Sequence, residues 1–134
     1  MTTRPRLGRY GAAGAIALAL ALAGCAPGDA SNPVATFQVA GGETYRIELA
    51  TPELVDHAER LLAGEQIAAI PLGPVVRDEA GVNEPWSWHI DPATLEFAEI
   101  TIEVCDGLPS YVEDMTITSD QFCPWSAQVI AVER

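Results

Sequence analysis

The stretch that decides the fold is Trp86-Ser87-Trp88-His89-Ile90-Asp91-Pro92, which contains two of the three tryptophans. Apolar and polar side chains alternate strictly through it. A period of two predicts a β-strand with one buried face, so both tryptophans and Ile90 face a core. Ser87, His89 and Asp91 then lie on the opposite face, and the Asp-Pro pair marks a break.

The residues that follow do not keep one phase. Leu95 and Phe97 fall on one face of an extended chain, whereas Ile100, Ile102 and Val104 fall on the other. A single strand accommodates both sets through a bulge near Ala98–Glu99, or by being buried on both sides. A helix after the proline is the less favoured alternative, because the second set is β-branched.

The residues before this stretch predict a hairpin, a helix and a strand. Apolar residues alternate over 37–49 around Gly41-Gly42, which is typical of two short strands joined by a glycine turn. Thr51 is expected to cap a helix that begins at Pro52 and ends near Gly64. Its predicted buried face is Leu54, Ala58, Leu61 and Leu62, and His57 is expected on the solvated face. Residues 67–76 contain two prolines and predict an edge strand.

The last third of the chain predicts a short helix and a final strand. A turn over 107–110 is followed by a helical piece over 111–115, with Ser110 as its expected cap. Residues 123–125 and 129–132 are expected to form one final strand. The order of these elements predicts an α+β domain: a small, mostly antiparallel sheet with one main helix packed on one face, plus a short second helix.

The N-terminus has the pattern of a lipoprotein signal. Three arginines precede an apolar run of about fourteen residues, which suits a signal peptide and is too short to span a bilayer. The run ends in Leu22-Ala23-Gly24-Cys25, which resembles a bacterial lipobox. We therefore expect a signal peptide over 1–24, lipid attached at Cys25, a flexible tether over 25–36 and one domain over 37–134. An ordinary signal peptide with an incidental Cys25 is the alternative.

The charge of the mature chain restricts its partners. After residue 24 it keeps 4 arginines and 19 acidic residues, a formal charge of −15, and it has no lysine. Nucleic acid is excluded as a partner, since its phosphates need clustered cations. Docking on anionic lipid is disfavoured, so the lipid alone is expected to hold the protein on the membrane. We interpret the acidic residues as serving the solubility of the protein. The alternative is that they form a surface that binds cations or a basic partner.

Cysteine parity predicts a disulfide. If Cys25 carries lipid, Cys105 and Cys123 remain, and an extracytoplasmic compartment permits them to bond. The bridge would close a loop of about twenty residues, which stabilises a fold by about 3 kcal/mol. Two buried free thiols are the competing interpretation, and no Cys-x-x-Cys redox pair is present.

Three constellations could carry chemistry. Ser87, His89 and Asp91 share a strand face, but neighbours on that face are about 6.6 Å apart and no nucleophile elbow accompanies them. Calcium could bind the carboxylates of Asp106, Glu113 and Asp114, or a metal could bind His89, Asp91, Glu99 and Glu103, although neither spacing is diagnostic. The possible ligand or structural cluster is Trp86, Trp88, His89, Asp91 and Trp125. Tryptophans in a small domain more often fill the core, and no metal ligand is assigned.

Several motifs together carry a family resemblance. They are Asn83-Glu84-Pro85-Trp86-Ser87-Trp88-His89-Ile90-Asp91-Pro92, Ile102-Glu103-Val104-Cys105-Asp106, Tyr111-Val112-Glu113 and Cys123-Pro124-Trp125-Ser126. Over residues 37–132 the chain resembles the N-terminal domain of the seventy-four-kilodalton class of calmodulin-binding protein, which has secreted bacterial relatives. The resemblance implies a small extracytoplasmic domain without a catalytic assignment. It does not extend to calmodulin binding, which uses a basic amphipathic helix, whereas the clear helix here is acidic.

These features together predict an extracytoplasmic bacterial lipoprotein that is a non-catalytic binding module. Its expected partners are the membrane, through the lipid, and a protein or small molecule. A calcium-dependent binding or adhesion module is the alternative, with calcium as its cofactor. A small hydrolase built on Ser87, His89 and Asp91 is the third and least favoured hypothesis.

Overall fold

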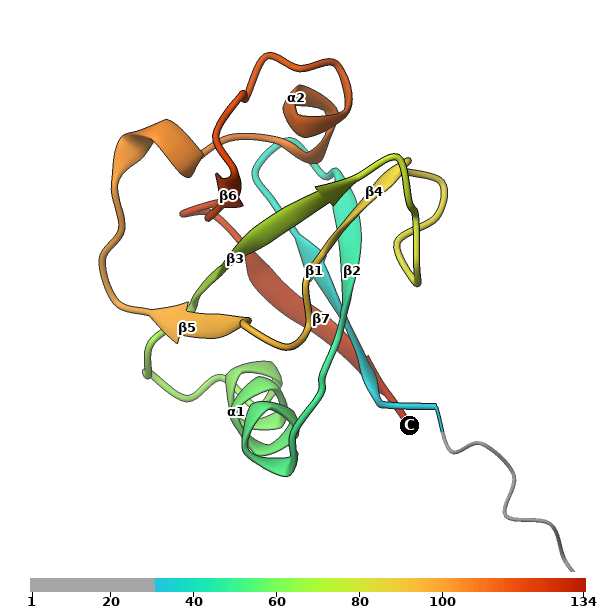
Figure 1. The fold of residues 1–134 in the computed structure, drawn as a ribbon. Coiled ribbons are helices and arrows are strands. Elements are labelled where there is room, and N and C mark those ends of the chain that lie inside the picture. Colours follow the sequence, from blue (N-terminus) through green and yellow to red (C-terminus); the bar gives the residue numbers. More distant parts are fainter. Residues whose placement is uncertain (1–30) are drawn as a thin grey trace, which may run out of the picture.

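Two antiparallel β-sheets face each other across the core of the computed structural model, which describes residues 31–134 (Figure 1). The strands are β1 (Val34–Gln38), β2 (Thr44–Glu48), β3 (Ile70–Arg77), β4 (Trp88–Ile90), β5 (Glu96–Ala98), β6 (Gln121–Phe122) and β7 (Gln128–Glu133). The helices are α1 (Pro52–Leu62) and α2 (Pro109–Glu113), with one 3₁₀ turn, η1 (Glu103–Cys105). The predicted α+β class, with antiparallel strands, a main helix and a short second helix, is confirmed, although the strands divide between two sheets.

The first sheet has the order β2-β1-β7. The hairpin of β1 and β2 is confirmed, and both turn glycines adopt the positive φ that favours glycine. β1 begins at Val34, so the predicted tether over 25–36 ends too late. Pro33 and the small residues Ala35 and Thr36 resemble a linker in composition, yet Ala35 is fully buried. Pairing with β7, nearly a hundred residues away, orders this segment.

Helix α1 begins and ends as predicted, but its buried face differs. The Thr51 hydroxyl accepts a hydrogen bond from the N–H of Leu54 at 3.3 Å, and Pro52 is the first helical residue. The buried residues are Val55 and Ala58, because α1 packs against β7. Leu62 is exposed, which corrects the predicted face.

His57 is not the solvated residue that its charged neighbours predict. It is half-buried, its ring stacks on Phe97 with centroids 4.4 Å apart, and its Nε2 lies 2.6 Å from the Ala68 carbonyl oxygen. The ring therefore ties α1 to the loop before β3 and to β5.

β3 is the central strand of the second sheet, which corrects its prediction as an edge strand. It pairs with β4, β5 and β6 along successive stretches. Each partner covers only two or three residues of β3. The missing N–H groups of Pro71 and Pro74 therefore interrupt no long ladder, and proline is tolerated there.

The alternation of β4 is confirmed, since Trp88 and Ile90 are buried while His89 is half-buried. The predicted strand through Val104 is wrong. β5 ends at Ala98, which pairs with Ile70, the first residue of β3. The chain beyond Ala98 has no further strand to pair with and leaves the sheet.

The C-terminal third also differs in detail. Ser110 does not cap α2, because the helix begins at Pro109 and Leu108 occupies the cap position. Ser110 instead donates from its N–H and its hydroxyl to the Glu43 carboxylate, at 2.9 and 2.7 Å. The predicted final strand is divided: β6 pairs with β3, and β7 pairs with β1 in the other sheet.

An aromatic cluster joins the two sheets. Tyr45 of β2 contacts Trp88 and Phe122 with ring centroids 6.0 and 5.4 Å apart, and Phe37 stacks on Tyr45 at 5.4 Å. Asn83, the one polar residue that is buried among residues 31–134, links the same layers. Its Oδ1 accepts from the Arg46 N–H and its Nδ2 donates to the Trp88 carbonyl, both at 2.8 Å.

Candidate functional site

Among residues 31–134, the most exposed of the large apolar side chains lie on the segment from β5 to the end of η1. Ile100 is 87% exposed, Ile102 68% and Val104 67%. A single exposed isoleucine is ordinary, but three β-branched side chains within five residues are a feature that marks interaction sites. Together with Trp125, which is 45% exposed, we call these residues the apolar loop surface.

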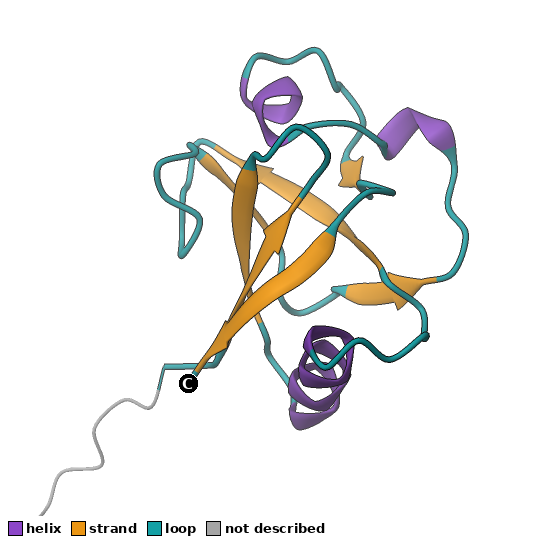
Figure 2. Cartoon of the chain, turned by 180° about the vertical axis from the view of Figure 1, so that it is seen from behind, coloured by secondary structure: helices purple, strands orange, loops and turns teal. Residues whose placement is uncertain are grey.

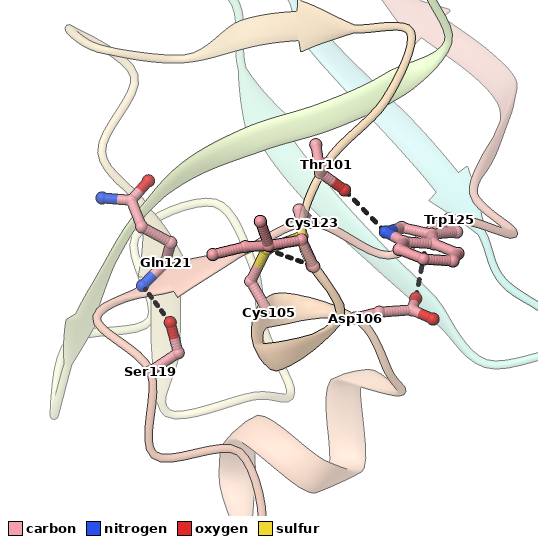
Figure 3. Close-up of a disulfide and its surroundings, with 8 residues drawn as sticks. Thr101, Cys105, Asp106, Ser119, Gln121, Cys123 and Trp125 are labelled. Carbon is pink, nitrogen blue, oxygen red and sulfur yellow. Dashed lines mark hydrogen bonds between the residues drawn. A yellow bond between two sulfur atoms is a disulfide. The ribbon is translucent and has the colours of Figure 1, made fainter.

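A disulfide fixes the end of this segment. Cys105 and Cys123 are bonded to each other, with their Cα atoms 5.1 Å apart, and both are buried (Figure 3). The Cys123 N–H also donates to the Cys105 carbonyl at 2.8 Å. The exposed side chains are therefore carried by a segment attached to the body of the protein through a covalent bond.

Trp125 attaches the other end of the segment. Its indole N–H donates to the Thr101 hydroxyl at 2.6 Å, and its main-chain N–H donates to the Asp106 carboxylate at 2.7 Å, as Figure 3 shows. Thr101 is half-buried while Ile100 and Ile102 on either side are exposed. The threonine thus faces the body of the protein, and the isoleucines face outward.

A shallow cavity lies beside the indole ring. Its volume is about 210 Å³, and its lining residues are Ile70, Glu99, Ile100, Thr101 and Trp125. Most of this lining is apolar, apart from one carboxylate and one hydroxyl. It could receive one apolar side chain of a partner, but it is smaller than a typical small-molecule site.

The charged groups around the surface are acidic. Glu99 and Glu103 flank the two exposed isoleucines and are themselves exposed, and Asp106 follows. Within residues 31–134, each arginine is engaged elsewhere. Three form ion pairs, with Glu133, Glu65 and Glu59 at 2.7, 2.9 and 2.7 Å, and Arg77 donates to two main-chain carbonyls. The apolar loop surface therefore has a negative rim that no described arginine neutralises.

The predicted cluster of tryptophan, histidine and aspartate is distributed over the fold. Trp88 lies in the core, whereas Trp86 is half-buried and donates from its indole N–H to the Thr44 carbonyl at 2.8 Å. His89 Nδ1 lies 2.7 Å from the Glu79 carbonyl oxygen, and the Asp91 carboxylate accepts from the Ala93 N–H at 2.9 Å. The fifth member, Trp125, belongs to the apolar loop surface.

The residues of the hydrolase hypothesis do not contact one another. The Ser87 hydroxyl donates to the Glu113 carboxylate at 2.8 Å, and the Ser87 N–H donates to the same carboxylate at 2.9 Å. The imidazole of His89 and the carboxylate of Asp91 have the separate partners given above. A triad needs its nucleophile, base and acid in hydrogen-bond contact, and this geometry lacks that contact.

In a comparison with known protein families, one family matches the whole described part of the chain. Residues 31–134 match the family described as the BP-74 N-terminal domain. The chain belongs to this family. The match covers every helix and strand of the fold, including the whole apolar loop surface. No curated protein and no solved structure matches the chain.

Membership of the BP-74 N-terminal domain family confirms the resemblance carried by the sequence motifs. The disulfide agrees with an oxidising, extracytoplasmic compartment, where such bonds persist. Among residues 31–134 no helix is both long and apolar enough to cross a bilayer. The predicted signal peptide over 1–24 and Cys25, the predicted site of lipid attachment, lie outside the described residues.

The candidate metal ligands are not gathered into a site. In the described part of the chain, no three His, Cys, Asp or Glu side chains are placed to hold one metal ion. Two of the proposed calcium ligands have other roles: Asp106 accepts from Trp125, and Glu113 accepts from Ser87. The calcium-dependent alternative draws no support from this geometry.

The site that sequence reasoning missed is the apolar loop surface itself. Ile100, Ile102 and Val104 were expected inside a strand because of their β-propensity. The signal that could have revealed them was the change of phase after Phe97. A change of face in a hydrophobic pattern means either a bulge or departure from the sheet, and only the second leaves these side chains exposed.

Proposed function

We propose that this protein is an extracytoplasmic, lipid-anchored binding module that contacts a partner through its apolar loop surface. One observation carries the proposal: Ile100, Ile102 and Val104 are mostly exposed on a segment that a disulfide secures. Fully burying such a side chain stabilises a fold or complex by about 1.5–3 kcal/mol. A partner that covers these three side chains would therefore gain favourable binding free energy.

The way the segment is held favours binding. A flexible loop must be ordered when it binds, and ordering one side chain costs about 0.5–1.5 kcal/mol. Here the bridge at Cys105 and the hydrogen bonds of Trp125 have already fixed the neighbouring main chain. The segment can therefore bind with a smaller loss of conformational entropy than a free loop.

The orientation of the fold is compatible with a membrane anchor. β1 begins beside the C-terminal end of β7, where Val34 pairs with Glu133, and the loop between β5 and η1 lies on the opposite side (Figure 1 and Figure 2). If lipid is attached at Cys25, the residues up to Pro33 can extend by at most about 28 Å. The apolar loop surface would then point away from the membrane, toward a partner in the surrounding space.

Site-specific photo-crosslinking in the native host tests the binding surface. The photoreactive residue benzoyl-phenylalanine would replace Ile100 in the full chain, and in a control it would replace Ile130, which is 45% exposed on β7. We expect a discrete adduct of higher mass from position 100 and none from position 130. Equal adducts from both positions, or none from position 100, would count against the surface.

Intact-mass spectrometry of the native protein tests the anchor separately. The variant Cys25→Ser removes the thiol that would carry the lipid, so this variant should not carry the mass of attached acyl chains. We expect intact-mass spectrometry to find that mass on the native protein alone. An unmodified native Cys25 would overturn the lipid anchor and leave the binding surface standing.

A further inference from the structure

We propose that the apolar loop surface binds an extended polypeptide segment of a partner protein that combines apolar side chains with arginine or lysine. This inference rests on the binding role proposed above and adds the chemistry of the partner. It follows from three properties of the segment: its unpaired main chain, its exposed isoleucines and its acidic rim.

The main chain of Ile100 and Thr101 is open to pairing. Within the described chain, the last pair between β5 and β3 is Ile70 with Ala98. Ile100 and Thr101 form no hydrogen bond with other main-chain groups of residues 31–134, whereas Ile102 is the N-cap residue of η1. Ile102 has the extended backbone of a strand, with φ −88° and ψ 153°. Free N–H and C=O groups on an extended segment are the template to which another strand adds.

The same groups argue against insertion into a lipid bilayer. The hydrocarbon interior has no partner for an unpaired N–H or C=O, so an irregular segment exposed to lipid is strongly disfavoured there. Another polypeptide supplies main-chain partners together with apolar side chains that would cover Ile100 and Ile102.

The acidic rim determines the charge of the partner. Glu99 and Glu103 flank the isoleucines, and no described arginine pairs with them. A second copy of this chain would bring the same carboxylates face to face, which is destabilising when strands pair. Arginine or lysine side chains on the added segment would instead pair with both carboxylates.

Fluorescence anisotropy with labelled peptides tests the proposal. The protein would be residues 25–134 carrying Cys25→Ser, which retains the complete core over residues 35–127. The probe is a peptide of about ten residues that alternates valine with lysine, long enough for one strand. One control peptide has glutamate for lysine, and another has alternate backbone nitrogens methylated, which removes the N–H donors of one edge.

We expect the lysine peptide to bind, and both control peptides to bind at least about tenfold more weakly. Its affinity should fall at least about fivefold between about 20 and about 300 mM NaCl, because salt screens exposed charges. Equal binding of the glutamate peptide, or undiminished binding of the methylated peptide, would overturn the proposal.

Matched variants assign the binding to this surface. Ile100→Ser with Ile102→Ser should weaken binding of the lysine peptide by at least about tenfold, as expected for central interface residues. Glu99→Gln with Glu103→Gln should weaken it and reduce its salt dependence. Ile130→Ser on β7 is the control and should change neither, and the urea midpoint of each variant verifies that it is folded.

Two further outcomes separate this inference from the proposed function. Adducts from position 100 in cells, combined with equal binding of acidic and basic peptides, would refute the cationic partner and keep the binding surface. Association with phosphatidylcholine vesicles that Ile100→Ser with Ile102→Ser abolishes, without peptide binding, would identify a lipid surface and refute a polypeptide partner.

Discussion

Removing the disulfide is expected to destabilise the fold by a predictable amount. Cys105 and Cys123 are 18 residues apart in the sequence. Closing a loop of this length removes unfolded-state entropy worth about 3 kcal/mol. A small domain has a total stability of about 5–15 kcal/mol, so the reduced protein should remain folded with a much smaller margin.

The loss should be largest around the apolar loop surface. The hydrogen bonds from Cys123 to the Cys105 carbonyl and from Trp125 to Asp106 do not require the bridge. They should hold the segment near its position, while its main chain opens more often. Hydrogen exchange at residues 99–106 should therefore rise more than exchange in the β1–β2 hairpin, whose strands keep the ladders that pair β1 with β2 and with β7.

Urea unfolding followed by tryptophan fluorescence measures the effect. We expect the midpoint of the oxidised protein to exceed that of Cys105→Ala with Cys123→Ala by about 2 M, for an m-value of about 1.5 kcal/mol per M. A reductant should lower the midpoint of the native protein and leave the variant unchanged. Identical midpoints for the oxidised and reduced native protein would show that the bridge contributes no stability, and would refute the reasoning.

Three further predictions concern the core and one helix end. Asn83→Ala should cost about 2–4 kcal/mol in urea unfolding, because it leaves the Arg46 N–H and the Trp88 carbonyl buried without partners; a loss below about 0.5 kcal/mol would contradict this. Burial raises the pKa of Tyr45 well above its usual value, so stability should fall as pH rises above about 10, where the unfolded tyrosine ionises first. Tyr45→Phe should reduce that alkaline loss of stability, and an unchanged pH profile would refute this prediction. At neutral pH the same variant should raise the free energy of unfolding by about 1 kcal/mol, since the buried hydroxyl has no partner within residues 31–134. Met115 has φ 66°, a left-handed conformation that is strained for residues other than glycine. Met115→Gly should therefore stabilise the fold by about 1 kcal/mol and raise the melting temperature; a lower melting temperature would contradict this.

The predictions that succeeded depend on interactions between near neighbours. A cap at Thr51, a glycine turn before β2 and the alternation of Trp88 with His89 are each decided within a few residues. The bridge between Cys105 and Cys123 follows from cysteine parity, once Cys25 is set aside as the lipid site. Such features can be inferred because their energies hardly depend on the rest of the chain.

The predictions that failed depend on which partner a segment meets. The prolines of β3 indicated an edge, but three short strands pair with β3 and leave no long ladder for proline to break. The isoleucines at 100 and 102 have strong β-propensity, but β-propensity does not reveal whether a neighbouring strand is available. Asn83 lay in a polar loop, and only the approach of β2 and β4 from both sides buries it.

The amino-acid sequence alone determined the fold class, the family and the oxidised cysteine pair, since these follow from composition, spacing and local pattern. Only the tertiary structure decided where binding could occur. Ala98 already pairs with the first residue of β3, so the main chain after it has no strand to join. The availability of a partner strand, which no local pattern encodes, therefore turned an expected part of the core into an exposed surface.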